Sequence, residues 1–391
     1  MIERISTQLK RVTASRGARI SILAGLVLAT AFFANAKSNS TPPLIDDPIV
    51  SPIDHVLINE RPRIEVVFAL DTTGSMSGLI DGAKQKIWSI VNQMADANTT
   101  PDIRMGLIGY RDRGDQYITK RFALTDDIDA LYANLQDFSA GGGGDGPESV
   151  NQALHEAVMQ MGWSPDQDVY KVIFLVGDAP PHMDYQDDVP YATSVELATR
   201  RGIVINTIQC GNGAEAARVF AGIAKLAQGQ FASISQSGGM VASHTPMDDK
   251  LSALNVALAE TVVAYGKDAE KRELLSKFRR SIAAAPSVVA SRLSYFSKKG
   301  GVANSGRADL VDALEANEVD LDEISEEALP AKMQIMSEPE RESYVREKAR
   351  QRGEIKAKIT ELARSRDDYL KQESKKRAAE GKADAFDDRL L

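Results

Sequence analysis

The chain has 391 residues, of which 43% are hydrophobic and 26% are charged, and its formal net charge is −8 at pH 7. This composition is typical of a globular protein with one large domain and room for a smaller one. The acidic balance argues against a general nucleic-acid-binding protein, which would present a basic face, so we expect no nucleic-acid partner.

The N-terminal segment has the features of a secretory signal peptide. Arginines precede an apolar stretch at 20–33, and an Ala-Asn-Ala cleavage sequence ends at Ala36. Because this stretch is shorter than the roughly 20 residues that a membrane-spanning helix needs, cleavage after Ala36 is favoured over a retained membrane anchor. We therefore predict a signal peptide at 1–36, a Ser-, Pro- and Asp-rich linker at 37–62, and a periplasmic or secreted bacterial protein that contacts the membrane only if the signal is retained.

Residues 63–266 alternate between short β-rich runs and longer helical patterns. This alternation predicts an α/β domain with a doubly wound, mostly parallel sheet flanked by helices. Most runs are continuous in Val, Ile, Leu and Phe, as expected for strands buried on both faces, and one run follows a short polar turn and predicts an antiparallel edge strand. The predicted strands span 64–70, 103–109, 117–123 (the edge strand), 169–176, 203–210 and 231–234, and the predicted helices span 79–95, 128–138, 149–161, 194–201, 214–227 and 247–265.

From 267 to 391 the composition shifts to charged helix formers without β-rich runs, which predicts a second, helical region. A helix is expected to begin at a capping box at Ser337, and the aperiodic end from Ala378 is expected to be disordered. The apolar edge of this helix has two interpretations. It packs on neighbouring elements of the same chain, or it forms a coiled coil with a partner. Arg352 and Arg366 lie on this edge and favour the first interpretation. The edge consists of Ile355, Ile359, Leu362, Tyr369 and Leu370.

Three loops after predicted strands carry candidate metal ligands, and in an open parallel sheet such loops meet at one edge. Asp71, Thr73 and Ser75 alternate, so in an extended loop their oxygens point the same way. Asp145 lies in a glycine-rich loop, and Asp178 follows the strand at 169–176. Each Asp alone is commonly a helix N-cap, but carboxylates and hydroxyls together are the ligands that Mg²⁺, Mn²⁺ or Ca²⁺ prefers.

These three motifs resemble those of a von Willebrand factor type A (vWA) domain. The chain as a whole is similar to exported bacterial members of that family that have a charged helical C-terminal region. The resemblance implies a metal-ion-dependent adhesion site (MIDAS) formed by Asp71, Thr73, Ser75, Asp145 and Asp178. It also implies a divalent cation, with Mg²⁺ expected and Mn²⁺ or Ca²⁺ as alternatives, and an open position for a carboxylate from a protein partner. Asp145 stands where the family has Thr, although some bacterial and alpha-kinase-associated members have a similar Asp-x-Pro-Glu loop. Asp71, Asp145 and Asp178 together would bring three negative charges to a cation with two positive charges. Asp145 is therefore expected either not to ligate the cation directly or to make the open position favour a neutral ligand from the partner.

Residues flanking these loops have weaker assignments. Asp112 and Arg111 have two interpretations. They form a surface turn with local salt bridges. Alternatively, Asp112 borders the metal site and Arg111 orients its carboxylates. His182 and the other three histidines lack zinc-like spacing and are interpreted as structural or surface residues. The single cysteine, Cys210, ends a predicted strand and is expected to be a buried thiol.

The sequence favours a metal-dependent protein-binding module without enzymatic activity. One alternative is a haloacid-dehalogenase-like phosphohydrolase that uses Asp71 as nucleophile. That chemistry lacks support because Thr72 stands where such enzymes have a second acid or Lys, and Lys171 lies at the wrong end of its strand. A second alternative is a scaffold that binds its partner through the helical tail.

Overall fold

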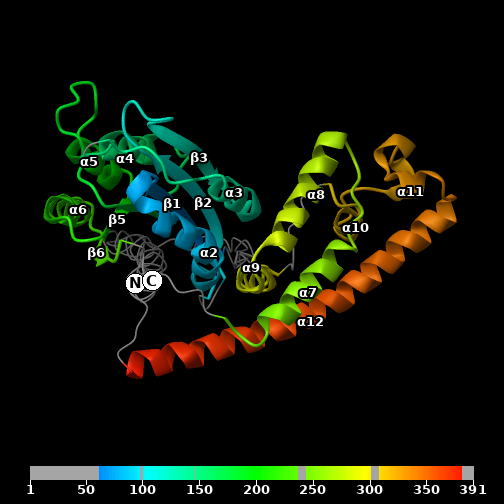
Figure 1. Cartoon of the computed structure of the whole chain (residues 1–391). Helices are drawn as coiled ribbons and strands as arrows, with labels where there is room; N and C mark the ends of the chain where they lie inside the picture. The colour runs from blue at the N-terminus through cyan, green and yellow to red at the C-terminus, as the bar shows by residue number, and fades with distance from the viewer. Residues whose placement is uncertain (1–60, 97–99, 145, 237–243, 301–307, 381–391) are drawn as a thin grey trace, which may run out of the picture.

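The computed structural model describes residues 61–96, 100–144, 146–236, 244–300 and 308–380. They form a unit built on a β-sheet and a unit built from helices, which lie side by side (Figure 1). The predicted signal peptide, nearly all of the predicted linker, Asp145 and the last residues of the tail fall outside these described residues.

The sheet has six strands in the order β3-β2-β1-β4-β5-β6, and every neighbouring pair is parallel except β2 and β3. This confirms the predicted doubly wound, mostly parallel sheet with an antiparallel edge strand. The edge strand begins two residues later than predicted because Tyr117 turns inward, where its hydroxyl lies 2.7 Å from the Thr72 hydroxyl. The strands are β1 (Arg63–Asp71), β2 (Asp102–Tyr110), β3 (Thr119–Thr125), β4 (Val169–Gly177), β5 (Ile203–Cys210) and β6 (Phe231–Ile234).

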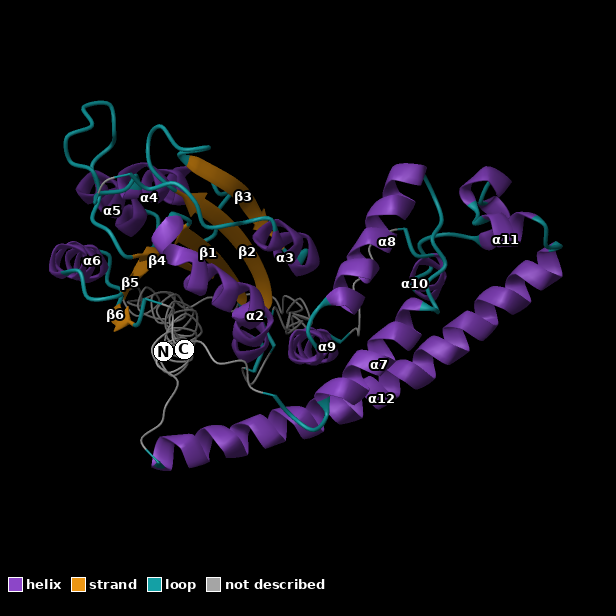
Figure 2. Cartoon of the chain, in the orientation of Figure 1, coloured by secondary structure: helices purple, strands orange, loops and turns teal. Residues whose placement is uncertain are grey.

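Helices cover both faces of the sheet (Figure 2). Alternate residues of β1 point to opposite faces, so Val66 and Phe68 belong to one apolar core while Val67 and Ala69 belong to the other. The first core is closed by α2 (Ser77–Met94) and α3 (Ile128–Gln136), and the second by α4 (Val150–Met159), α5 (Tyr191–Arg200) and α6 (Ala214–Leu226).

The helical unit is built around α7, α9 and α12, whose apolar side chains form a separate core with Leu251, Leu293 and Ile359 fully buried in it. The predicted helix at 247–265 is shorter in the structure and packs in this unit rather than on the sheet. No helix of the described residues has the length and apolar character that crossing a membrane requires. The helices are α7 (Asp248–Ala259), α8 (Asp268–Ala283), α9 (Pro286–Lys299), α10 (Leu310–Glu315), α11 (Ala331–Gln334) and α12 (Glu338–Ala379).

The long helix α12 is held along its length by two buried arginines. Arg352 contacts Asp309 at 2.8 Å and Asp312 at 2.6 Å, and Arg366 contacts Asp248 at 2.8 Å. Together with the burial of Ile359, these contacts agree with the first interpretation of the apolar edge, in which it packs within the chain. Arginines at these positions select one axial register, because a shift of α12 would leave buried carboxylates unpaired.

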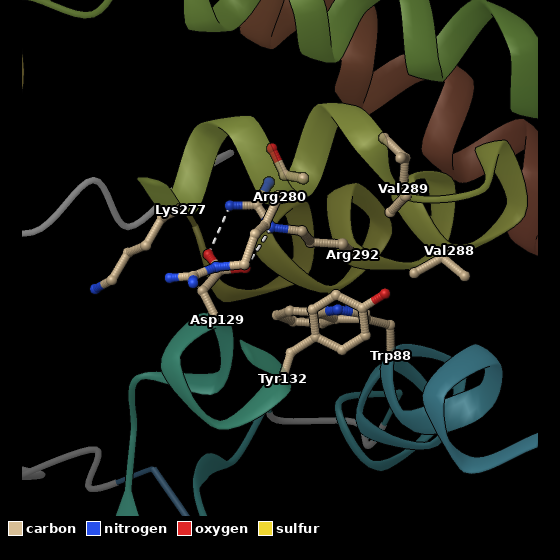
Figure 3. Close-up of a pocket in the computed structure, with 10 residues that line it drawn as sticks. Trp88, Asp129, Tyr132, Lys277, Arg280, Val288, Val289 and Arg292 are labelled. Carbon is tan, nitrogen blue, oxygen red and sulfur yellow. Dashed lines mark hydrogen bonds and ion pairs between the residues drawn. The ribbon is translucent and has the colours of Figure 1, made fainter. Parts of the chain in front are cut away.

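Helix α9 joins the two units. Its Arg292 makes a two-pronged contact with Asp129 of α3, at 2.6 Å for each nitrogen–oxygen pair, beside the ring of Trp88 (Figure 3). The aromatic side chains of Tyr295 and Phe296 pack against the same Trp88 ring. A buried ion pair and an aromatic cluster therefore fix the helical unit on the α2 and α3 side of the sheet.

We predict that Arg352→Ala destabilises the protein by about 3–5 kcal/mol, because it leaves the buried Asp309 carboxylate without a counter-charge. Urea unfolding followed by circular dichroism measures this change. Arg350→Ala on the same helix is the matched control and is expected to have no measurable effect, because its partners Glu347 and Glu354 are solvent-exposed. Equal losses in the two variants would contradict the role assigned to the buried pair.

Candidate functional site

The site lies at the edge of the sheet where β1 and β4 end. These strands are parallel neighbours with Leu70 opposite Val176, so Asp71 and Asp178 leave the sheet at the same edge. Asp71 is fully buried, whereas Asp178 is partly exposed. Gly177 makes this close approach possible, because a Cβ at this position would lie 2.3 Å from the Tyr110 hydroxyl and 3.3 Å from the Asp71 Cβ.

The first loop brings its three predicted ligands together. Asp71 Oδ1 accepts hydrogen bonds from the Thr73 amide at 2.8 Å and from the Thr73 hydroxyl at 2.6 Å. The Thr73 and Ser75 hydroxyl oxygens lie 3.3 Å apart. Asp71 Oδ2 is buried and has no hydrogen-bond partner. A buried carboxylate oxygen left without a donor is costly, and a cation is a group that would satisfy it.

The third loop is joined to the first by Gln236. The Gln236 side-chain amide donates to Asp178 Oδ2 at 2.6 Å and to the Ser75 carbonyl at 3.3 Å. Burial raises the pKa of Asp71 to about 7, and the nearby Asp178 carboxylate adds to this shift. The structure thus brings Asp71, Thr73, Ser75 and Asp178 together at one edge of the sheet, and their role as metal ligands stays a prediction.

The glycine-rich second loop lies against the first. The Gly74 amide donates to the Gly142 carbonyl at 3.1 Å, and the Gly141 amide donates to the Thr72 carbonyl at 3.1 Å. Gly142 has a φ of +74°, a conformation that favours glycine. Asp145 itself lies outside the described residues, so its predicted role as a ligand stays a prediction.

Glu148, at the end of this loop, is an acidic residue to which sequence reasoning gave no role. It is 4% exposed, and its Oε2 has no hydrogen-bond partner. Burial, together with the charges of Asp71, Asp112, Asp115 and Asp178, raises the pKa of Glu148 to about 9. The signal available in the sequence was the place of Glu148 three residues after Asp145, after a run of glycines and directly before a predicted helix.

The donor set has a definite chemical character. Within the described ranges, no three His, Cys, Asp or Glu side chains gather closely enough to hold a metal ion by themselves. A cation at this edge would therefore depend on the Thr73 and Ser75 hydroxyls in addition to carboxylates. Hydroxyl and carboxylate oxygens suit hard divalent cations, and the two buried carboxylate oxygens without partners fit such an ion.

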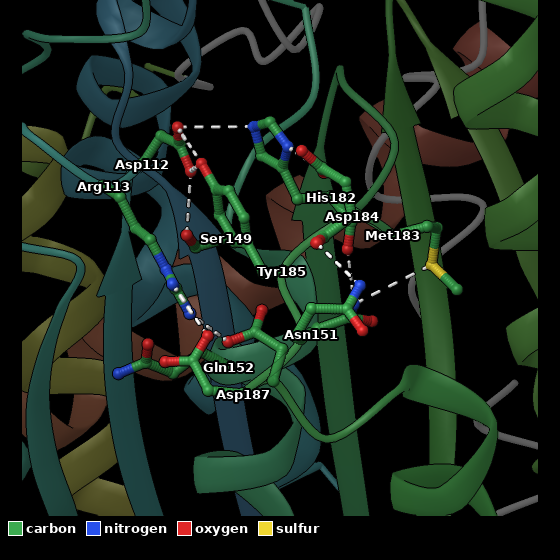
Figure 4. A network of polar contacts seen from close by, with 12 residues as sticks. Asp112, Arg113, Ser149, Asn151, Gln152, His182, Met183, Asp184, Tyr185 and Asp187 are labelled. Atoms are coloured by element: carbon green, nitrogen blue, oxygen red, sulfur yellow. Dashed lines mark hydrogen bonds and ion pairs between the residues drawn. The ribbon is translucent and has the colours of Figure 1, made fainter.

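A network of polar contacts flanks the site and holds the loops after β2 and β4 together (Figure 4). Asp112 accepts from the Ser149 hydroxyl at 2.9 Å and from the Tyr185 hydroxyl at 2.9 Å, and it lies 3.3 Å from His182 Nε2. The Arg113 guanidinium stacks on the Tyr185 ring at 4.0 Å. Asp112 is therefore a buried residue that joins these loops, and His182 is buried beside it rather than exposed on the surface.

Arg111 does not orient carboxylates as one interpretation held. Its guanidinium donates to the Thr72 carbonyl at 3.1 Å and to the Ser139 carbonyl at 2.7 Å. These contacts link the first and second loops through backbone atoms. The side chain also lies over the Tyr117 ring, 4.5 Å from its centre. The predicted thiol burial at Cys210 is confirmed.

Comparison with protein families supports the resemblance over the sheet unit. Residues 65–245 match the family model of the von Willebrand factor A domain. Over 122 residues, or 30% of this chain, the sequence is 29% identical to an ariadne-like RING finger protein of Acanthamoeba polyphaga mimivirus. It is 28% identical over 122 residues, again 30% of this chain, to alpha-protein kinase vwkA of Dictyostelium discoideum. The matches span 11% and 19% of the lengths of these two proteins.

Solved structures show similarity at low sequence identity. Proximal thread matrix protein 1 from the mussel byssus aligns with a TM-score of 0.37 and 16% identity, covering 46% of this chain and 44% of that chain. A form of that protein with a zinc-occupied MIDAS motif aligns with a TM-score of 0.35 and 17% identity, covering 45% and 42%. The SpRpn10 VWA domain aligns with a TM-score of 0.33 and 17% identity, covering 44% of this chain and 88% of that chain.

We predict that, in the metal-free protein, the contribution of Asp71 to the free energy of unfolding falls as the pH rises from about 4 to about 7. The pKa of Asp71 is raised from 3.8 to about 7 in the folded protein. In this window the folded state retains a proton that the unfolded state has lost, so folding becomes less favourable as the pH increases. Asp71→Asn removes this component. Urea unfolding in EDTA at several pH values tests it, and identical pH slopes for wild type and variant would contradict the prediction.

Proposed function

We propose that this chain is a metal-dependent protein-binding module whose vWA domain holds a divalent cation with Asp71, Thr73, Ser75 and Asp178. The observation that carries the proposal is the buried Asp71 Oδ2, which has no donor although it lies beside two hydroxyls and a second carboxylate. A bound cation would satisfy this oxygen and act as the Lewis acid that accepts a ligand from a partner.

Mg²⁺ is the proposed cation, with Mn²⁺ and Ca²⁺ as alternatives. The two hydroxyls of the first loop lie within 3.3 Å of each other, and such compact oxygen sets suit small hard cations. The partner is proposed to be a protein that supplies the remaining ligand, either a carboxylate or a neutral oxygen. The predicted signal peptide leads us to propose that binding takes place in the periplasm or outside the cell.

A binding function without catalysis is also proposed on chemical grounds. A phosphohydrolase that used Asp71 as nucleophile would need a lysine near it. Lys171 is the third residue of β4 and lies near Glu65. It is therefore close to the start of the strand, whereas Asp71 lies at the edge of the sheet where the strands end. The Thr72 hydroxyl donates to the Tyr110 carbonyl at 2.9 Å, so this side chain serves the fold.

We expect calorimetric titration of Mg²⁺, Mn²⁺ and Ca²⁺ into the purified full chain to show saturable binding. Asp71→Ala is expected to weaken that binding at least about tenfold, since it removes the central carboxylate. The same samples are assayed for hydrolysis of p-nitrophenyl phosphate, where no turnover is expected. Absence of binding by wild type would contradict the metal site, and Asp71-dependent turnover would contradict the binding-module proposal.

The scaffold alternative needs a variant that leaves packing intact. Deleting α12 would expose the apolar core around Leu251 and Leu293, so a tail deletion would report unfolding. Arg346→Glu with Lys358→Glu instead changes only exposed positions of α12. If this double variant loses partner binding while Asp71→Ala keeps it, the scaffold interpretation replaces the metal-dependent one.

A further inference from the structure

We infer that two copies of this chain associate through their helical units. The contact joins the outer face of α8 in one copy to an acidic segment of the other copy. We define the α8 face as Arg272, Leu275, Arg279 and Ile282, and the acidic segment as residues 315–327. The inference goes beyond the proposed function, because it involves neither a cation nor the edge of the sheet where β1 and β4 end.

The α8 face presents apolar side chains to solvent at helical spacing. Leu275 and Ile282 are each 40% exposed. They are seven residues apart and so lie on one side of the helix, where Arg272 and Arg279 flank them at the same spacing. Apolar side chains at this spacing are typical of a helix face that packs against another protein surface. Because the fold leaves both side chains exposed, the α8 face is a candidate docking surface.

The arginines of the α8 face determine the charge of what docks there. Neither Arg272 nor Arg279 has a carboxylate partner in the part of the chain that the structure describes. By contrast, Lys277 of the same helix pairs with Asp127, directly before α3. The two arginines therefore make a local positive surface on a chain whose formal net charge is −8, and this surface favours an acidic occupant.

The acidic segment has the complementary charge. Two of its side chains have basic partners, Glu315 with Lys356 at 3.8 Å and Glu326 with Arg341 at 3.0 Å. Its other carboxylates have no basic partner among the described residues. All of its acidic residues are exposed, namely Glu315, Glu318, Asp320, Asp322, Glu323, Glu326 and Glu327.

An exposed apolar side chain lies beside the acidic segment, as apolar side chains do on the α8 face. Ile335 follows α11 directly and is 88% exposed. Arg341 holds this position against the segment, because its Nη2 lies 3.0 Å from the Glu326 carboxylate and 3.2 Å from the Gln334 carbonyl. The two surfaces are thus opposite in charge, and each offers apolar contact area.

The two surfaces do not pair within one copy. In the view of Figure 1, α8, α10 and α11 all lie above α12, but no ion pair joins the α8 face to the acidic segment in the described ranges. The Gly266 amide donates to the Ala328 carbonyl at 2.9 Å, so the start of α8 lies next to the end of the segment. Arg279 is 11 residues beyond Asp268, or about 16 Å further along the helix. The fold therefore holds complementary charges apart, and a second copy can supply each missing partner.

A two-fold axis between two copies would form both contacts at once. Each copy would give its α8 face to one contact and its acidic segment to the other, as in an isologous dimer. Two α8 faces would not meet, because like charges repel. Association that depends on opposite exposed charges is strongest at low salt.

Sedimentation velocity of the purified full chain in EDTA tests this inference, at about 50 mM and about 500 mM NaCl. EDTA keeps the result independent of the proposed cation. One variant, Arg272→Glu with Arg279→Glu, reverses the charge of the α8 face. A second, Glu318→Lys with Glu323→Lys, reverses charges of the acidic segment, and a third combines all four changes. Circular dichroism shows whether each variant is folded.

The matched control is Lys358→Glu with Arg364→Glu, which changes the charge by the same amount as the first variant at exposed positions of α12. We expect wild type and control to form dimers at low salt that dissociate at high salt. Each variant that reverses one surface is expected to raise the Kd of the dimer at least about tenfold. The combined variant is expected to return the Kd to within about threefold of wild type, because the charges are again complementary.

Wild type that stays monomeric at every concentration and at both salt concentrations would contradict the inference, as would a combined variant that does not recover association. Flotation with vesicles of phosphatidylcholine and phosphatidylglycerol tests another occupant. If wild type floats with these vesicles without forming dimers, and Arg272→Glu with Arg279→Glu does not float, the α8 face binds an anionic lipid surface and the inference is wrong. None of these outcomes affects the proposed function, which the metal titration tests through Asp71.

Discussion

The parallel pairing of β1 with β4 is the constraint on which the candidate site depends. It places the ends of two central strands side by side, so Asp71 and Asp178 must approach each other whatever the loops do. Burial of the Asp71 carboxylate, together with the charge of the neighbouring Asp178, raises the pKa of Asp71 to about 7 in the metal-free fold. The sheet therefore creates an unfavourable charge arrangement that nearby donors relieve only in part.

The donors around this edge are arranged to leave a definite gap. Thr73 satisfies Asp71 Oδ1, and Gln236 satisfies one oxygen of Asp178. Asp71 Oδ2 and Glu148 Oε2 remain without partners. A divalent cation beside Asp71 and Asp178 would offset the two carboxylate charges that this edge of the sheet brings together.

The parts of this fold that the sequence predicts are those that depend on local pattern. Continuous apolar runs identify the strands, and the spacing of Asp71, Thr73 and Ser75 identifies the first loop because three alternating residues share one face. The position of Glu148 has no local signal. It depends on the bridge to Pro180, which brings together residues 32 positions apart through the order of the strands.

Longer-range packing explains the other differences between prediction and structure. The pattern of α7 is helical, but nothing in its own residues indicates that Leu251 packs with Ile359 more than 100 positions later. Tyr117 has the β-propensity of an edge strand, yet its hydroxyl pairs with Thr72 and its ring lies beneath Arg111. At Tyr117 a tertiary contact overrides a local preference, whereas α7 keeps its helical conformation and distant residues decide only where it packs.

Helix α2 connects the candidate site with the helical unit. It begins at Ser77, directly after the first loop, and at its other end Asn92 donates to Asp367 of α12 at 3.3 Å. Lys298 of α9 and Lys371 of α12 each lie 3.0 Å from Asp96, just beyond the end of α2. The helical unit thus anchors the far end of the helix that follows the first loop, so these contacts support the position of that loop without contributing a ligand to it.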